Sequence, residues 1–437
     1  MKSAPPTRRL ILLALAALAI RLGYCAASGE LGQTPDKYGT EYVLVGERLL
    51  QHGTMVSPLI LGDGTNEPSC LMPPVYAGIV AAVYRIFGNR SVTSAAVLQT
   101  LNAAATAVAA LVVFFVAQRL GDRRAGWIAA LVVAVNPLCI IYTGMFWDTG
   151  LFTLAVGVVV LLVLRLEDRT ITWSRGIAFG AVLGVVALIN PALTIAYPLL
   201  VLWMLTRKGP IRLTPLLRGI AAVIIGWLVV IAPWTIRNYI HFEELVYIRS
   251  GLGLELWLGA CPEADEARGR VFHARFPTLN PAEQERLVEM GEAAYLEDCK
   301  EKALAAIDAN PWTNLKLASL RLVDYWAGTV FTHRAPGVGG WPVTTSRSVL
   351  TVLLCGEVLM IALGVAILVA TGRSQTDVWW LVAIVLVFSV TYGCTHVFIR
   401  FRAPLEPLFA VLLGLCVTRI WPSIRRANGH RISDAAS

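Results

Sequence analysis

The sequence predicts an all-α protein that crosses a membrane many times. Hydrophobic residues make up 56% of the 437 residues and charged residues only 15%, whereas about 25% of a soluble globular chain is charged. The mean hydropathy is +0.64. Apolar stretches of about 18 residues or more recur along the chain, which is the length that a helix needs to cross a bilayer. The roughly ten-residue alternating pattern of membrane β-strands is absent, so the sequence favours a helical bundle.

The apolar stretches place ten membrane spans. The first follows Arg8-Arg9 and contains Arg21. Because further spans follow it, we interpret this stretch as an uncleaved signal-anchor and not as a cleaved signal peptide. The expected spans are residues 9–27, 93–118, 124–142, 149–166, 175–190, 192–206, 217–235, 347–371, 377–395 and 403–421.

One more apolar stretch, Leu71 to Phe87, is interpreted as a re-entrant or interfacial helix. It is short, and Pro73-Pro74 stands near its start and Arg85 near its end. If it crossed the membrane, the arginines after the next span would lie outside, against the positive-inside rule. If it stays on the outer surface, the basic loop residues fall on the inside, namely Arg119, Arg123, Arg124, Arg165, Arg169, Arg175, Arg207, Lys208, Arg212, Arg218, Arg373, Arg419, Arg425, Arg426 and Arg431.

This topology places both termini in the cytoplasm and two large segments outside. In the second of them, Asn280-Pro281 predicts a helix start, and Asn310-Pro311 predicts another. The apolar side of that last helix either rests on the membrane or packs on its own loop. The expected divisions are an N-terminal transmembrane module (1–237) with its first outer segment (28–89), an α-rich extracytoplasmic domain (238–346), C-terminal transmembrane helices (347–422) and a polar cytoplasmic tail (423–437).

Five motifs follow one another along the chain, mostly on the expected outer side. They are Pro35-Asp36 with Glu41-Tyr42; Pro73-Pro74-Val75-Tyr76 to Phe87-Gly88; Asn136-Pro137 with Tyr142 and Asp148; Pro233-Trp234-Thr235-Ile236-Arg237-Asn238-Tyr239; and Arg400-Phe401-Arg402-Ala403-Pro404. In order and spacing they resemble the C-type glycosyltransferase superfamily. Within it they are similar to the family-39-like group, which holds protein O-mannosyltransferases and bacterial aminoarabinose transferases.

Two details depart from that group's pattern. Extra residues separate Pro35-Asp36 from Glu41-Tyr42, so both Asp36 and Glu41 are candidates for the catalytic acid. Leu71-Met72 also stands where the group often has Arg or Lys before Pro-Pro, near the donor phosphate.

The resemblance implies a bundle of about ten to eleven transmembrane helices with interfacial helices, in the bacterial inner membrane. It also implies a hexosyl- or pentosyltransferase that is inverting and has its active site on the extracytoplasmic face. The donor is expected to be a sugar on a polyprenyl phosphate, and the acceptor a lipid, a glycan or a protein. Such a transfer needs a carboxylate as general base and cations that stabilise the departing phosphate.

The expected site residues follow from these needs. For the general base, Asp36 is the first choice and Glu41 the second, against the alternative of solvated loop acids. For the donor phosphate, Arg400 and Arg402 are expected, with Arg237 in support, because outer arginines do not serve the positive-inside rule. Asp148, Tyr42 and Tyr76 are expected to bind substrate, although an acid at a helix start and interfacial tyrosines explain these residues equally well.

The same residues also bear on other partners and functions. No metal site and no required cofactor are expected, although a divalent cation is possible, and the histidines show no metal-ligand spacing. The net charge of +8 is explained by topology-setting arginines, so no nucleic-acid partner is expected. Cys261 and Cys299 are a candidate disulfide on the outer side. The alternative function is a transporter or flippase of lipid-linked sugars, which would place its site at mid-bilayer.

Overall fold

The protein is helical throughout the part that the computed structural model describes. That part comprises residues 7–34, 40–60, 68–166, 171–206, 213–266, 270–327, 344–370, 372 and 376–419. Within these ranges the only β-type pairing is an isolated bridge between Val56 and Pro68. The fold is therefore all-α, as predicted. Asp36 and the tail at 423–437 lie outside the described residues.

Seven helices among the described residues are long and apolar enough to cross a membrane, which confirms a multi-pass membrane protein. Four belong to labelled helices of the N-terminal half: α1 (Thr7–Ala27), α4 (Val92–Leu120), α7 (Thr149–Leu166) and α10 (Leu213–Phe242). Three lie towards the C-terminus: α17 (Thr344–Ala370), α18 (Thr376–Cys394) and the segment Ile399–Arg419, which begins with the 3₁₀ helix η3 (Ile399–Leu405).

The other three predicted spans are helical but shorter. Asn136 ends the first of them and caps a new helix, because its side chain accepts from the amides of Leu138 and Cys139. Asn190 caps the helix that begins at Pro191 in the same way, at the start of the third of these spans. These elements are α5 (Arg123–Val135), α6 (Pro137–Ile141), α8 (Trp173–Ile189), η1 (Pro191–Ala196) and α9 (Tyr197–Thr206).

Arg21 holds the break between α5 and α6. It is fully buried, although it lies within the first span. Its guanidinium donates to the carbonyls of Val133 and Ala134 at 2.9 Å and to the hydroxyl of Thr106 at 2.7 Å. These carbonyls belong to the last turn of α5, where no following amide of the helix is available to donate to them. Arg21 is thus a structural residue that ties α1 to α4 and α5.

Helices α8 and α10 pack backbone against backbone. A Cβ atom at Gly226 would overlap the carbonyl oxygen of Ile177, and one at Gly180 would overlap the carbonyl oxygen of Val223. Small residues permit this close approach, which is a common device between membrane helices because lipid gives little hydrophobic drive for association.

Replacing Gly226 with Leu should therefore separate α8 from α10 and destabilise the protein by about 1–3 kcal/mol, the usual cost of overpacking. The measurement is the thermal midpoint of purified protein in detergent. Gly356→Leu is the matched control, because a Cβ at Gly356 in α17 meets nothing within 4 Å. Equal midpoints for the two variants would contradict the predicted close contact.

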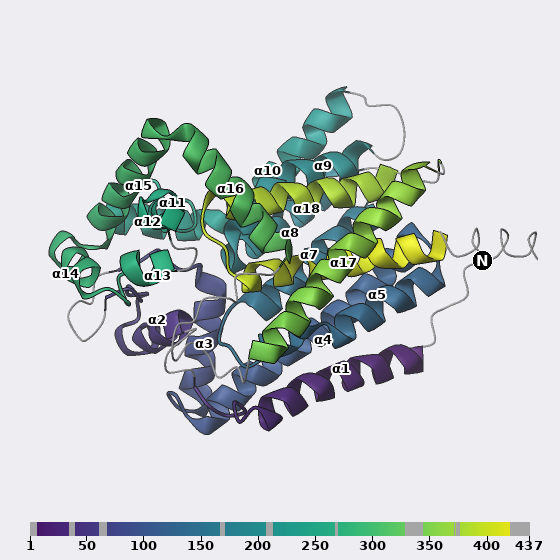
Figure 1. The fold of residues 1–437 in the computed structure, drawn as a ribbon, viewed down its shortest axis with the longest axis horizontal. Coiled ribbons are helices and arrows are strands. Elements are labelled where there is room, and N and C mark those ends of the chain that lie inside the picture. Colours follow the sequence, from purple (N-terminus) through teal and green to yellow (C-terminus); the bar gives the residue numbers. More distant parts are fainter. Residues whose placement is uncertain are drawn as a thin grey trace, which may run out of the picture.

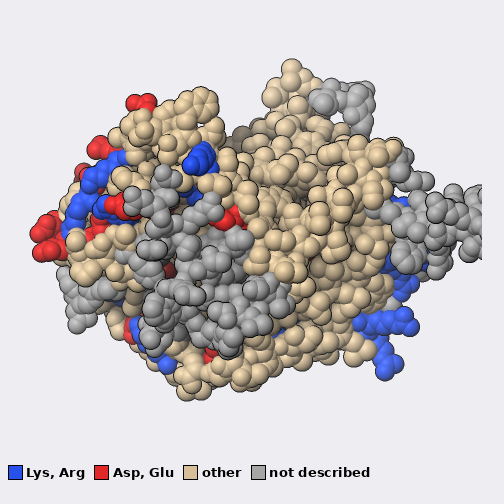
Figure 2. All heavy atoms as spheres, in the orientation of Figure 1, with Lys and Arg blue, Asp and Glu red and all other residues tan. Residues whose placement is uncertain are grey.

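Arginines gather at one end of the bundle. Arg419 donates to the Leu120 carbonyl at 3.0 Å, which places it beside the end of α4, and Arg119 faces Arg165 there. On the face drawn in Figure 2, the end nearest the N-terminus shows blue side chains and no red ones, whereas the opposite end carries both. This asymmetry fits the positive-inside prediction, which assigns the arginine-rich end to the cytoplasm.

The two large predicted outer segments lie together at the opposite end (Figure 1). The Ser69 hydroxyl donates to the Glu292 carboxylate at 2.7 Å, and the Ser250 amide donates to the Cys70 carbonyl at 3.1 Å. The first segment contributes α2 (Thr40–His52) and α3 (Pro74–Phe87). The second contributes α11 (Leu252–Ala260), α12 (Glu263–Glu266), α13 (Arg270–Arg275), α14 (Pro281–Met290), α15 (Glu292–Ala309) and α16 (Pro311–Ala327).

Within these segments the details follow the sequence closely. Helix α3 is 14 residues long and begins directly after Pro73, so it is too short to cross a bilayer unaided. The side chain of Asn280 caps α14, as predicted. The expected disulfide is wrong: Cys261 and Cys299 are both buried free thiols. Cys261 packs beside Leu317, and Cys299 packs in a separate cluster beside Tyr295.

Candidate active site

Arg400 is a cation without a carboxylate partner in the described part of the chain. It lies in η3, a tight 3₁₀ segment before the last membrane helix. Its guanidinium carbon lies 3.7 Å from the centroid of the Trp147 ring, which is a cation–π contact. No hydrogen bond or ion pair joins Arg400 to any of the described residues. Its donors are therefore available to an anion.

Asp148 follows Trp147 and begins α7. Its carbonyl accepts from the Phe152 amide at 2.8 Å, and its carboxylate Oδ2 accepts from Asn190 Nδ2 at 2.7 Å. The side chain is 8% exposed. Burial raises the pKa of Asp148, and the Asn190 hydrogen bond and the charges of Arg400 and Arg249 oppose that rise. Asp148 is thus a buried acid held in place by an amide and facing two arginines.

Helix α2 brings Glu41 and Tyr42, the second half of the predicted acid motif, to the same place. Glu41 Oε2 accepts from the indole Nε1 of Trp147 at 3.3 Å. Tyr42 is buried, faces Asp148 and meets the Tyr76 ring edge-to-face at 5.0 Å. The indole of Trp147 therefore joins an acid of the first outer segment to Arg400.

Tyr76 lies on α3 and is held in place by a residue of α4. Its hydroxyl and the side chain of Asn102 in α4 exchange hydrogen bonds of 3.0 and 3.2 Å. Gly46 allows α2 to lie directly against α3, because a Cβ there would meet Val80 at 2.5 Å. Packing of α2 on α3 thus fixes Tyr42 and Tyr76 beside Asp148.

A second arginine, Arg249, enters this cluster from the large outer segment. Its Nη2 lies 3.1 Å from Glu255 Oε1, and Glu255 Oε2 lies 2.5 Å from His396 Nδ1. Burial alone would raise the pKa of Glu255, but His396, Arg249 and Arg400 outweigh it and lower that pKa to about 2. Glu255 therefore stays ionised at physiological pH. Its carboxylate contacts both Arg249 and His396, close to Arg400.

Arg402, another arginine predicted to bind the donor phosphate, lies among internal partners and not beside Trp147. It is fully buried. Its guanidinium donates to Glu406 at 2.8 Å, to Glu357 at 2.7 Å and to the Trp326 carbonyl at 2.7 Å. Glu406 in turn accepts from Asn136 at 2.7 Å. One residue separates the two arginines, so in the tight η3 turn their side chains point to different surroundings. The donors of Arg402 are taken up by Glu406, Glu357 and the Trp326 carbonyl inside the protein.

Replacing Arg402 with Met should destabilise the protein by about 3–5 kcal/mol, because it leaves two carboxylates buried without their cation. The measurement is the thermal midpoint in detergent. The triple variant Arg402→Met, Glu357→Gln, Glu406→Gln should recover much of the loss, since no uncompensated charge remains. A single variant as stable as the unchanged protein would contradict the structural role.

Arg237 also lies apart from Arg400. It stands near the end of α10, and its guanidinium donates to the Ser69 carbonyl at 2.8 Å and the Thr54 hydroxyl at 3.2 Å. None of the described side chains or carbonyls to which Arg237 donates belongs to the group around Arg400. Of the three predicted phosphate ligands, only Arg400 faces the predicted substrate residues.

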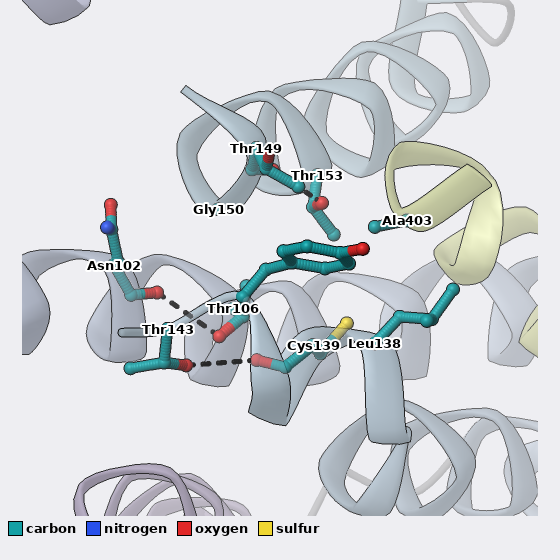
Figure 3. Close-up of a pocket in the computed structure, with 10 residues that line it drawn as sticks. Asn102, Thr106, Leu138, Cys139, Thr143, Thr149, Gly150, Thr153 and Ala403 are labelled. Carbon is teal, nitrogen blue, oxygen red and sulfur yellow. Dashed lines mark hydrogen bonds between the residues drawn. The ribbon is translucent and has the colours of Figure 1, made fainter. Parts of the chain in front are cut away.

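A small cavity lies beneath the cluster and is too narrow for a sugar. It holds about 10 Å³, roughly the space that one water molecule requires. Its wall is polar on one side, where Thr106 donates to the Asn102 carbonyl at 3.2 Å and Thr143 donates to the Cys139 carbonyl at 3.0 Å (Figure 3).

Sequence reasoning missed Arg249, Glu255, His396 and Asn190. Arg249 and Glu255 are six residues apart on the outer segment, which is a weak signal. Their neighbours His396 and Arg400 come from a distant part of the chain, from the segment after α18 and from η3. His396 carries no signal in the sequence beyond the absence of metal-ligand spacing. Among the described residues no group of three or more His, Cys, Asp and Glu side chains is arranged to hold a metal ion.

Comparison with known proteins gives a match in structure but not in sequence. No protein-family model and no curated protein matches the sequence. The oligosaccharyltransferase AglB from Archaeoglobus fulgidus, solved with an inhibitory peptide and a dolichol-phosphate, matches with a TM-score of 0.54 and 14% identity, over 97% of this chain and 51% of that chain. Its apo form gives the same values. ArnT from Cupriavidus metallidurans, bound to undecaprenyl phosphate, has a TM-score of 0.44 and 15% identity, over 95% and 79%.

The match to AglB shows the fold: the chain folds like AglB and spans about half of that protein's length. At this level of identity the likeness concerns the fold, so function has to be argued from the site.

Proposed function

We propose that this protein is a membrane glycosyltransferase that moves a sugar from a polyprenyl phosphate to an acceptor on the extracytoplasmic side. The observation that carries the proposal is Arg400, a cation without an ionic partner among the described residues, stacked on Trp147 between two acids. The fold adds support, because AglB, which shares it, was solved with a dolichol-phosphate. An inner-membrane location with the site facing outward follows from the positive-inside argument.

The leaving phosphate is the part of the reaction that arginines serve. When the bond between the anomeric carbon and the phosphate oxygen breaks, its electron pair stays on the phosphate, whose charge increases. Arg400 and Arg249 both act on Asp148 and Glu255, so they share a small region. Guanidinium groups bind phosphate oxygens in pairs, and donors aimed at developing charge lower the barrier.

The acceptor needs a base, and Glu41 is best placed for it. Its carboxylate accepts from the Trp147 indole at the partly exposed start of α2. It takes the proton of the acceptor hydroxyl as that oxygen attacks the anomeric carbon. Attack opposite to the leaving phosphate inverts the configuration at that carbon.

Asp148 has a different role in this proposal. It is buried and already accepts a hydrogen bond from Asn190, so it orients the sugar by accepting from a donor hydroxyl. Tyr42 and Tyr76 form the apolar wall on which the sugar ring lies. Asp36, a few residues before α2, remains the competing candidate for the base. If the reaction uses a divalent cation, the carboxylates of Asp148 and Glu41 would be the groups to hold it.

The direct experiment is to incubate the purified protein in detergent with radiolabelled sugars on polyprenyl phosphate and to score free polyprenyl phosphate. The acceptor is supplied as a membrane lipid extract, as a glycan or as a peptide in separate reactions. Release that requires the protein and one acceptor class supports the proposal. Movement of intact donor across vesicle membranes, without release, would instead support a flippase.

A further inference from the structure

A second pocket lies on the other side of α2. It has a volume of about 540 Å³, within the range of sites that hold small ligands or lipid headgroups. Apolar and proline side chains form most of its wall, among them Leu49, Met55, Pro74 and Trp234. Arg237 and His241, one helical turn apart on α10, supply the basic groups, and none of the described lining residues is acidic.

The guanidinium of Arg237 is held in place, but no ion pair with any of the described residues neutralises its charge. Its hydrogen bonds go to uncharged acceptors, which are the Ser69 carbonyl, the Thr54 hydroxyl and the Asn238 side chain. Its guanidinium carbon lies 4.8 Å from the centroid of the Trp234 ring. The nearby Glu292 directs its carboxylate to the Ser69 hydroxyl. Arg237 is therefore a fixed cation at the wall of an apolar pocket.

The pocket is reachable from the bilayer. Arg237 and His241 lie at the end of α10, which is a candidate membrane span. Their neighbours on α10 are large and exposed, with Ile236 at 57% and Ile240 at 68% of full exposure. Apolar side chains left open on a membrane helix contact lipid. A lipid lying along this side of α10 would present its headgroup to the pocket.

The pocket is also separate from the transfer site but shares a wall with it. Glu41 lies at the start of α2, and Leu49 lies eight positions later, which is about 12 Å along a helix at about 1.5 Å per residue. One buried cluster of α2 and α3 side chains packs against both Trp147 and Trp234. A lipid in the pocket would thus be within reach of the sugar transferred at Glu41.

We infer that this pocket binds the phosphate-bearing headgroup of a second lipid, other than the polyprenyl phosphate donor, and that this lipid carries the accepting hydroxyl. The inference rests on the proposed function for the role of the lipid, and on the pocket alone for its binding. Basic pockets at the ends of membrane helices are typical sites for anionic headgroups. The phosphate would accept from Arg237 and His241, and its chains would lie on Ile236 and Ile240.

The test is lipid binding to the full chain in detergent, measured by native mass spectrometry with two probes. Dioleoyl phosphatidic acid reports on a glycerolipid phosphate, and a short-chain polyprenyl phosphate reports on the donor site. Arg237→Gln should weaken phosphatidic acid binding about tenfold or more, as expected for loss of a charge-assisted hydrogen bond. It should leave polyprenyl phosphate binding unchanged, and Arg400→Gln should do the reverse.

Two controls separate binding from folding. Leu49→Trp fills the pocket while leaving the hydrogen bonds of Arg237 intact, so it should also lose phosphatidic acid, with a thermal midpoint close to that of the unchanged protein. Unchanged phosphatidic acid binding in both variants would overturn the inference, as would loss of polyprenyl phosphate from Arg237→Gln. If only the Arg400→Gln arm fails, the second-lipid pocket stands and the proposed donor site is wrong.

Discussion

Replacing Glu41 with Gln should lower sugar transfer by about 10²–10⁴-fold, the usual contribution of a positioned general base. The amide keeps the shape of the side chain and can still accept from Trp147, but it cannot take the acceptor proton. Membrane insertion and the thermal midpoint should not change, because Glu41 is partly exposed and carries no buried ion pair. The measurement is the initial rate of polyprenyl phosphate release at saturating donor and acceptor.

Three further variants locate the base among the neighbouring acids. Glu47→Gln is the matched control, since Glu47 lies on the same helix but pairs with Arg90 on the surface, and it should keep full activity. Asp148→Asn should raise the KM for the donor more than it lowers kcat if Asp148 orients the sugar. If Asp36→Asn abolishes transfer and Glu41→Gln does not, the base is Asp36.

Replacing Arg400 with Gln should lower kcat by about 10²–10³-fold, the effect of removing one donor aimed at the charge of a transition state. Arg400 has no ionic partner among the described residues, so its loss leaves no buried acid unpaired and the protein should remain stable. Arg400→Lys should retain part of the activity, because it keeps the charge but loses the paired donors and the flat stacking surface on Trp147.

The matched control for this second variant is Arg90→Gln, another arginine of the predicted outer surface. Arg249→Gln should lower transfer in the same way as Arg400→Gln, and the double variant should cost less than the product of the two effects if both bind one phosphate. Full activity in Arg400→Gln would remove the phosphate role from Arg400 and, with it, the main support for the proposed function.

Much of the fold was predictable because hydrophobic length is a local property. The spans, the short α3 after Pro73 and the cap at Asn280 each depend on a few consecutive residues and on the thickness of a bilayer. The lengths of the three shorter spans were not predictable. Asn136-Pro137 and Asn190-Pro191 break the helix inside the apolar stretch, and hydropathy does not register such a break.

The site was predictable in its types of residue but not in its membership. Arg400 and Arg402 look alike in the sequence, and only the η3 turn sends one to Trp147 and the other to Glu357 and Glu406. Nothing in the sequence distinguishes Arg249 from other loop arginines. Its place in the cluster depends on Glu255 of α11, which contacts both Arg249 and His396. Cys261 and Cys299 looked like a pair until packing placed them in different clusters.

The sequence by itself determined that this chain is a helical membrane protein, which end of it is basic, and which motifs gather on the opposite side. These properties follow from composition and from the energy of placing apolar and charged groups in or beside lipid. Only the tertiary structure decided which arginines are available to a phosphate and which are consumed by internal carboxylates. That choice depends on contacts between side chains from different segments, such as Arg400 with Trp147 and Arg402 with Glu357, for which a linear pattern carries no distance information.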